Sequence, residues 1–210
     1  MKKLIIAGAL MLATTVMQAQ DNQWVRPQDD TSVQQTKSKS AKQIADQKYM
    51  AGAVPEVDGR VVFTHSLTAP GKSSTEIYDR LLKRLQQMTH EEDQIKSRVA
   101  IVNPGTHEIG AAFEEWMTFK RSGLVLDRTR FYYTVHVRCG EGTADVTVNR
   151  MRYLYEEERT PQTMTAEEWI TDKQALNKKK TKLLPVSAKF RRKTVDRMEE
   201  LFNGLAAALQ

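Results

Sequence analysis

Cysteine is almost absent from this sequence, which contains a single one, Cys139. One cysteine excludes a disulfide within the chain, so a folded domain must be held together by its core alone. Cys139 closes an apolar strand pattern, which favours a buried, inert thiol over a reactive one. A segment of about 150 residues is long enough to build a core of that kind.

Long apolar runs are equally scarce, and the one that exists lies at the start of the chain. Lys2 and Lys3 precede an apolar stretch over 4–17, and the small Ala19 follows. A cationic start, a short apolar core and a small residue at the cut are the parts of a secretory signal peptide. A spanning helix needs about 20 apolar residues, which disfavours a retained anchor. We predict a signal peptide over 1–19, cleaved after Ala19, no transmembrane anchor after cleavage, and an exported chain that is periplasmic, on the cell surface or secreted.

Catalytic and metal-binding motifs are also missing. The sequence has four histidines, and none has a second ligand at the spacing of a zinc site. A Gly-x-Ser-x-Gly nucleophile elbow does not occur. Neighbouring carboxylates such as Glu114–Glu115 are expected to be solvated surface charges rather than an acid–base pair. We therefore predict no catalytic residues, no metal and no cofactor.

Residues 20–52 contain few apolar groups and many Gln, Asp, Ser, Thr and Lys. A stretch of this composition cannot bury enough surface to offset its chain entropy. We predict a flexible polar linker over 20–52 and a folded domain over 53–210.

The folded part combines strand and helix patterns. Period-two patterns between turn signals predict strands over 60–67, 96–102, 107–119, 130–139 and 144–155, with a bulge between Val148 and Met151. Capping boxes and apolar spacings of three and four predict helices over 74–89, over 165–176 and from about 187 onward. This order predicts a two-layer α+β domain, in which helices cover one face of an antiparallel sheet.

The strings Val57–Phe63 and Ser73–Tyr78, the hairpin 131–155 and the last amphipathic helix carry a resemblance. Together with the order of elements, they resemble a family of exported bacterial domains of unknown function with a TATA-binding-protein-like (TBP-like) fold. The resemblance covers roughly 54–209 and implies the order β-α-β4-α, with a short extra helix before the last one. The family has no known activity, so the resemblance implies no functional residues, and fold alone does not imply function.

The sheet face away from the helices is the first candidate binding surface. It would present Tyr132, Thr134, His136 and Arg138, with Tyr153 or Arg152 added by the paired strand. Aromatic and arginine side chains are the groups that binding surfaces favour. The alternatives are an ordinary polar face, or a face covered by the helix over 165–176.

A basic stretch over 178–193 is the second candidate surface, and it contains no acid. The residues expected to contact an anion are Lys178, Lys179, Lys180, Lys182, Arg191 and Arg192. Export disfavours nucleic acid as the partner and favours anionic lipid headgroups or acidic glycans. The alternative is a solvated linker and helix start.

These observations predict a non-catalytic exported module of the bacterial cell envelope. Its partner would be an envelope protein, a glycan or a lipid surface. Two other functions stay open. One is a hydrolase of envelope or dietary polymers, with His136 and a neighbouring carboxylate as acid–base groups. The other is binding of nucleic acid or an anionic surface through 178–193, which would weaken steeply with salt.

Overall fold

The computed structural model describes residues 46–123 and 125–210. The predicted signal peptide and the predicted linker up to residue 45 lie outside the described residues. Within those residues, no helix combines the length and the apolar character needed to span a membrane.

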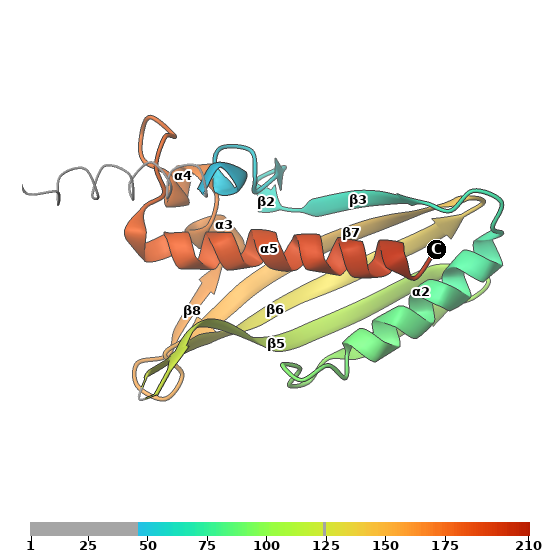
Figure 1. Cartoon of the computed structure of the whole chain (residues 1–210), viewed down its shortest axis with the longest axis horizontal. Helices are drawn as coiled ribbons and strands as arrows, with labels where there is room; N and C mark the ends of the chain where they lie inside the picture. Colours follow the sequence, from blue (N-terminus) through green and yellow to red (C-terminus); the bar gives the residue numbers. More distant parts are fainter. Residues whose placement is uncertain (1–45, 124) are drawn as a thin grey trace, which may run out of the picture. The chain divides into compact units, whose positions relative to one another are not determined.

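A six-stranded antiparallel sheet forms the centre of the domain (Figure 1). Five strands follow the order β3-β7-β6-β5-β4, and β8 pairs with the last part of β7, on the same side as β3. The strands are β3 (Phe63–Thr68), β4 (Arg98–Asn103), β5 (Glu108–Ser122), β6 (Val125–Gly140), β7 (Thr143–Tyr155) and β8 (Gln162–Thr165). A separate short hairpin, β1 (Glu56–Val57) and β2 (Arg60–Val61), precedes β3.

Two long helices, α2 (Ser74–Met88) and α5 (Pro185–Ala207), cover one face of this sheet (Figure 1). Helix α2 begins where the sequence places its capping box, because the Ser73 side chain accepts a hydrogen bond from the Glu76 backbone N–H. Alternate residues of β6, among them Phe131, Tyr133 and Val135, are buried beneath the helices. The predicted two-layer α+β architecture is therefore confirmed.

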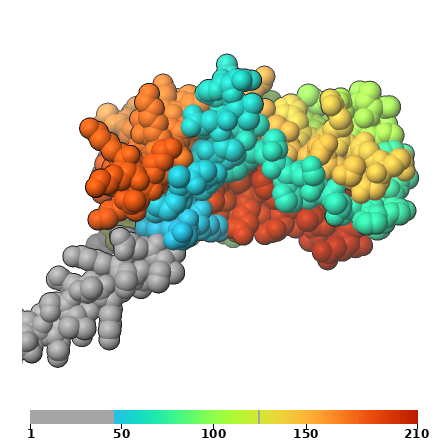
Figure 2. Space-filling model, turned by 90° about the horizontal axis from the view of Figure 1, so that it is seen from above, coloured from blue at the N-terminus to red at the C-terminus, as the bar shows by residue number. Residues whose placement is uncertain are grey.

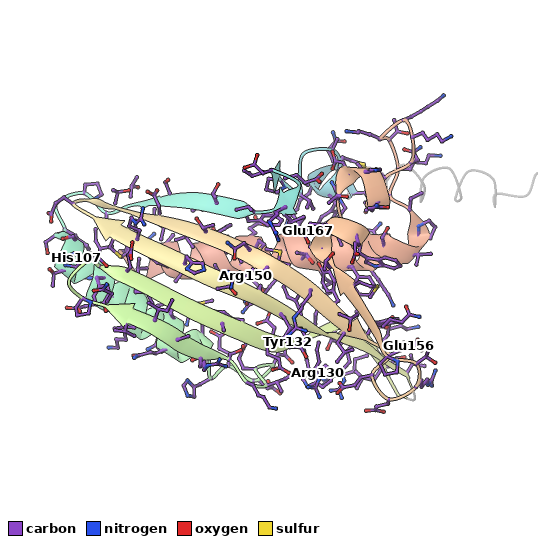
Figure 3. All side chains as sticks on the ribbon, turned by 180° about the vertical axis from the view of Figure 1, so that it is seen from behind. His107, Arg130, Tyr132, Arg150, Glu156 and Glu167 are labelled. Carbon is purple, nitrogen blue, oxygen red and sulfur yellow. The ribbon has the colours of Figure 1, made fainter. Side chains whose placement is uncertain are left out.

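The helix predicted over 165–176 is instead two short helices, α3 (Ala166–Trp169) and α4 (Asp172–Ala175). The break has a physical cause at Ile170, whose carbonyl accepts a hydrogen bond of 2.6 Å from the guanidinium of Arg191. The Trp169 ring lies 6.0 Å from that of Phe190 in α5, so α3 belongs to the helical layer. The opposite face of the sheet is left uncovered by any described helix (Figure 3).

The predicted bulge is present in β7. Tyr132 pairs with Arg152 but Thr134 pairs with Asn149, so β7 carries one extra residue between these pairs. The extra residue is accommodated at Arg150, whose backbone is left-handed with a φ of 55°. A bulge reverses the parity of the strand beyond it, which decides the face that each later side chain occupies.

The domain begins earlier than its predicted boundary at residue 53. Residues 46–52, which include the 3-10 helix η1 (Gln47–Tyr49), lie against α5 and the segment around α4 (Figure 2). The fully buried Arg191 donates to the carbonyls of Tyr49 and Met50, each at 2.7 Å, and pairs with Asp172. A buried guanidinium needs such acceptors, which explains why this polar segment is held in place.

Candidate functional site

The candidate site is the open face, which we define as the side of the sheet away from α2 and α5. The structure places four of the predicted residues on it, at alternate positions of β6: Tyr132, Thr134, His136 and Arg138. The residues that alternate with them, at the odd-numbered positions from Phe131 to Val137, point into the core. His136 and Arg138 are exposed, whereas Tyr132 and Thr134 are half-buried.

Tyr153 is not on the open face, and its predicted place there was wrong. Its ring is buried in the core, 5.1 Å from that of Phe131, and its hydroxyl shares a hydrogen bond of 2.7 Å with Thr194 of α5. Burial raises the pKa of Tyr153 above its usual range. The bulge at Arg150 is the cause, because beyond it the even-numbered Arg152 faces outward.

Arginines stack on aromatic rings along this face. The Arg152 guanidinium lies 3.8 Å from the centre of the Tyr132 ring, and that of Arg128 lies 3.6 Å from Trp116. Such stacking holds guanidinium groups in a defined plane while leaving their N–H donors free. Trp116 was not among the predicted residues. The feature that could have located Trp116 on this face is the pairing of β5 with β6, which sets it opposite Arg130.

The two arginines at the bulge, Arg150 and Arg152, have no carboxylate partner within residues 46–123 and 125–210. Both are exposed; Arg150 lies at the bulge itself (Figure 3), and Arg152 follows two residues later. By contrast, Arg130 pairs with Glu114 at 3.0 Å and with Glu157 at 2.7 Å. A left-handed backbone at a non-glycine residue costs about 1–2 kcal/mol, and strain of this kind is concentrated at functional sites. The bulge therefore marks the part of the face that is best prepared for an anionic group.

A hollow of about 340 Å³ lies on the same face, between the bulge and the turn that joins β6 to β7. Its lining includes Ile101, Gly110, His136, Asp145 and Thr147. Glycine at 110 leaves room for its neighbour, because a Cβ there would lie 3.0 Å from the Ile101 side chain. The polar side chains in its lining, among them His136, Asp145 and Thr147, suit it to a small polar group of a larger partner.

The basic stretch divides into a buried half and an exposed half. Arg191 and Arg192 were predicted to contact an anion, and this is corrected: Arg191 is fully buried, and Arg192 pairs with Asp46 at 2.6 Å. The exposed half is the loop 177–183. There the Asn177 side chain accepts hydrogen bonds from the backbone N–H groups of Thr181 and Lys182. The side chains that this loop exposes are Lys178, Lys179, Lys180 and Lys182.

A buried ionic cluster replaces the solvated pair expected at Glu114–Glu115. Glu115 is only 4% exposed, and Arg197 of α5 donates to its two oxygens at 2.8 and 3.0 Å. Gln94 and the Tyr133 hydroxyl also donate to this carboxylate. With its oxygens occupied by these donors, Glu115 ties α5 to the sheet rather than reacting. No cluster of three or more metal-ligating side chains occurs in the part of the chain that the structure describes.

The strand order, the two helices on one face and the uncovered opposite face define a TBP-like α+β domain. The family model described as a domain of unknown function (DUF4468) with TBP-like fold matches residues 63–154. The chain is similar to the crystal structure of a DUF4468 family protein from Bacteroides ovatus, with 43% identity and a TM-score of 0.73, over 78% of this chain and 94% of that one. The chain therefore belongs to the DUF4468 family, as the resemblance predicted.

A second solved structure agrees with this fold. It is a TBP-like protein from Parabacteroides distasonis, with 17% identity and a TM-score of 0.63, over 75% of this chain and 97% of that one. At this identity the likeness shows the fold alone. No curated protein matches the chain.

Proposed function

We propose that this chain is a non-catalytic binding module exported to the bacterial cell envelope, and that its open face contacts the partner. The observation that carries the proposal is the pair Arg150 and Arg152 at the bulge: neither has a carboxylate partner in the described residues, and Arg152 stacks on the Tyr132 ring. Planar guanidinium groups with free N–H donors recognise carboxylates and phosphates in a two-pronged geometry. The partner is therefore an acidic glycan or an acidic protein segment of the envelope.

The contacts around His136 favour binding over hydrolysis. An acid–base mechanism would need a carboxylate that is free to act with this histidine. Two acidic residues of the open face, Glu108 and Asp145, lie opposite Arg138, two residues along β6 from His136, and each already has a hydrogen-bonding partner. Glu108 pairs with Arg138 at 2.8 Å, and Asp145 accepts a hydrogen bond of 2.6 Å from Ser66. The export step itself is supported by the predicted signal peptide, through its cationic start, apolar core and Ala19.

The test is charge reversal on the open face. The chain without its predicted signal peptide is immobilised and exposed to an array of acidic and neutral glycans and to envelope extract. The variant Arg150→Glu/Arg152→Glu is compared with Lys83→Glu/Lys193→Glu, which makes the same charge change at exposed positions of α2 and α5. We expect the open-face variant to lose the bound acidic partner and the control to keep it. Equal retention by both variants would contradict the proposal.

A second candidate function is supported at the loop 177–183. Next to its lysines, Leu184 and Val186 expose 39% and 68% of their surfaces. Lysines beside exposed apolar side chains are typical of a protein surface that contacts anionic lipid headgroups. This function would hold the domain against a membrane while the open face binds its partner.

Vesicle co-sedimentation tests this second function. Each lysine near an anionic bilayer contributes about 1 kcal/mol, so Lys178→Gln/Lys179→Gln should weaken binding to phosphatidylglycerol vesicles by about 30-fold. Lys83→Gln/Lys193→Gln is the control and should bind as the unchanged chain does. Binding to pure phosphatidylcholine vesicles that equals binding to phosphatidylglycerol vesicles would exclude the function.

A further inference from the structure

Strand β4 is an edge of the sheet with unusual side chains. It pairs with β5 on one side, and its other side has no strand partner in the described residues. Between Arg98 and Asn103 the strand reads Val-Ala-Ile-Val. Ile101 and Val102 point to opposite faces, and they are 51% and 52% exposed. The edge therefore presents apolar surface on both faces, beside a row of backbone groups that can pair with another strand.

The opposite edge of the same sheet lacks this property. The exposed side chains of β3 are polar: Thr64, His65, Ser66 and Thr68. Natural proteins protect sheet edges with charged side chains, proline or bulges. In β4 a bulge at Ala100 provides some protection, but the residues that follow it, Ile101–Asn103, return to regular pairing with β5.

We propose that β4 pairs with the β4 strand of a second copy of this chain, antiparallel about a two-fold axis. In that arrangement the start of one strand lies opposite the end of the other. Arg98 then faces Asn103 and Val99 faces Val102, so no charge opposes its own kind. The same strand serves on both sides of the interface, as a two-fold dimer requires.

The pairing would join two six-stranded sheets into one, with both open faces on a continuous surface. Ile101, which lines the hollow of the open face, would lie next to the interface. The inference does not rest on the proposed function, because it uses the edge of the sheet and not the arginines at the bulge.

The first experiment is sedimentation velocity of the chain without its predicted signal peptide, over roughly 1–100 µM. We expect a dimer whose dissociation constant rises at least about 100-fold in Ile101→Lys and in Val102→Lys, because each lysine would place a charge against an apolar residue of the second copy, Ala100 or Val99, at the strand edge. Thr64→Lys on β3 is the matched control and should dimerise normally. Circular dichroism of each variant verifies that the monomers are folded.

The second experiment fixes the geometry. Val99→Cys/Val102→Cys in a Cys139→Ser background should oxidise to a covalent dimer, because each new cysteine faces the other one across the two-fold axis. The proposal is overturned by a monomer at every concentration, or by a dimer that both edge lysines leave intact. The variant Arg150→Glu/Arg152→Glu should remain dimeric, so a failure of the open-face function would be recognised separately.

Discussion

Glu114 and Glu115 are neighbours in the sequence, yet they belong to two different environments. Glu114 lies on the open face, half-buried, in an ion pair with Arg130. Glu115 points into the core, where Arg197, Gln94 and Tyr133 occupy its oxygens. The two glutamates, on opposite faces of one strand, therefore have different roles. The core face uses charge to fix a helix on the sheet, and the open face uses it in an ion pair between two neighbouring strands.

The largest expected difference between the faces is in stability. Glu115→Ala should lower the free energy of unfolding by about 3 kcal/mol, because it leaves the guanidinium of Arg197 mostly buried without its partner. Glu114→Ala should lower it by less than about 1 kcal/mol, as is usual for pairs near the surface. Urea denaturation of both variants measures the difference. Equal losses of stability in the two variants would contradict the different roles of the two glutamates.

A smaller difference is expected in thiol chemistry. Burial raises the pKa of Cys139 to about 11, so at pH 8 nearly all of this thiol is protonated and unreactive. The adjacent position 138 is on the open face, where the Arg138 side chain is 77% exposed. A cysteine introduced there (Arg138→Cys, with Cys139→Ala) should have an ordinary pKa of about 8.5 and react with iodoacetamide about 200-fold faster.

Mass spectrometry of the alkylated protein measures both rates. The sign of the pH effect is a further check. The rate at Cys139 should rise about tenfold per pH unit between pH 8 and 10, because the thiolate fraction grows until the pH reaches the raised pKa. The rate at position 138 should level off above about pH 9. A Cys139 rate that levels off equally early would contradict its burial.

The smallest effect is expected at the bulge. Arg150→Gly should raise the free energy of unfolding by about 0.5–1 kcal/mol, because glycine takes a left-handed backbone without strain. Arg152→Gly, two residues away, should lower it by a similar amount, because glycine weakens an ordinary strand. Thermal denaturation compares the two. A loss of stability in Arg150→Gly would contradict backbone strain at residue 150.

The sequence was sufficient for the order of the long strands and of the two long helices, because the core strands alternate and α2 begins at a capping box, but it did not predict β8. It also located the bulge between Val148 and Met151. It could not decide which side chains the strand exposes beyond that bulge, because a single extra residue exchanges the faces of Arg152 and Tyr153. The surface assigned to Tyr153 was wrong for that reason.

Long-range partners account for the other errors. Arg191 is basic and lies in a basic stretch, so local composition favours exposure. Its acceptors are the carbonyls of Tyr49, Met50 and Ile170, which lie between 21 and 142 residues away in the chain. No local pattern predicts such a set. The same hydrogen bonds divided the helix expected over 165–176 and brought residues 46–52 into the domain.

The docking of residues 46–52 has a mechanical consequence. A pull on the chain at Asp46 is first resisted by its two hydrogen bonds to Arg192, and then by the carbonyls held by Arg191. Both arginines belong to α5, so the load enters the long helix and not an end strand of the sheet. A domain attached in this way can bear tension from its N-terminal side while its strands stay paired.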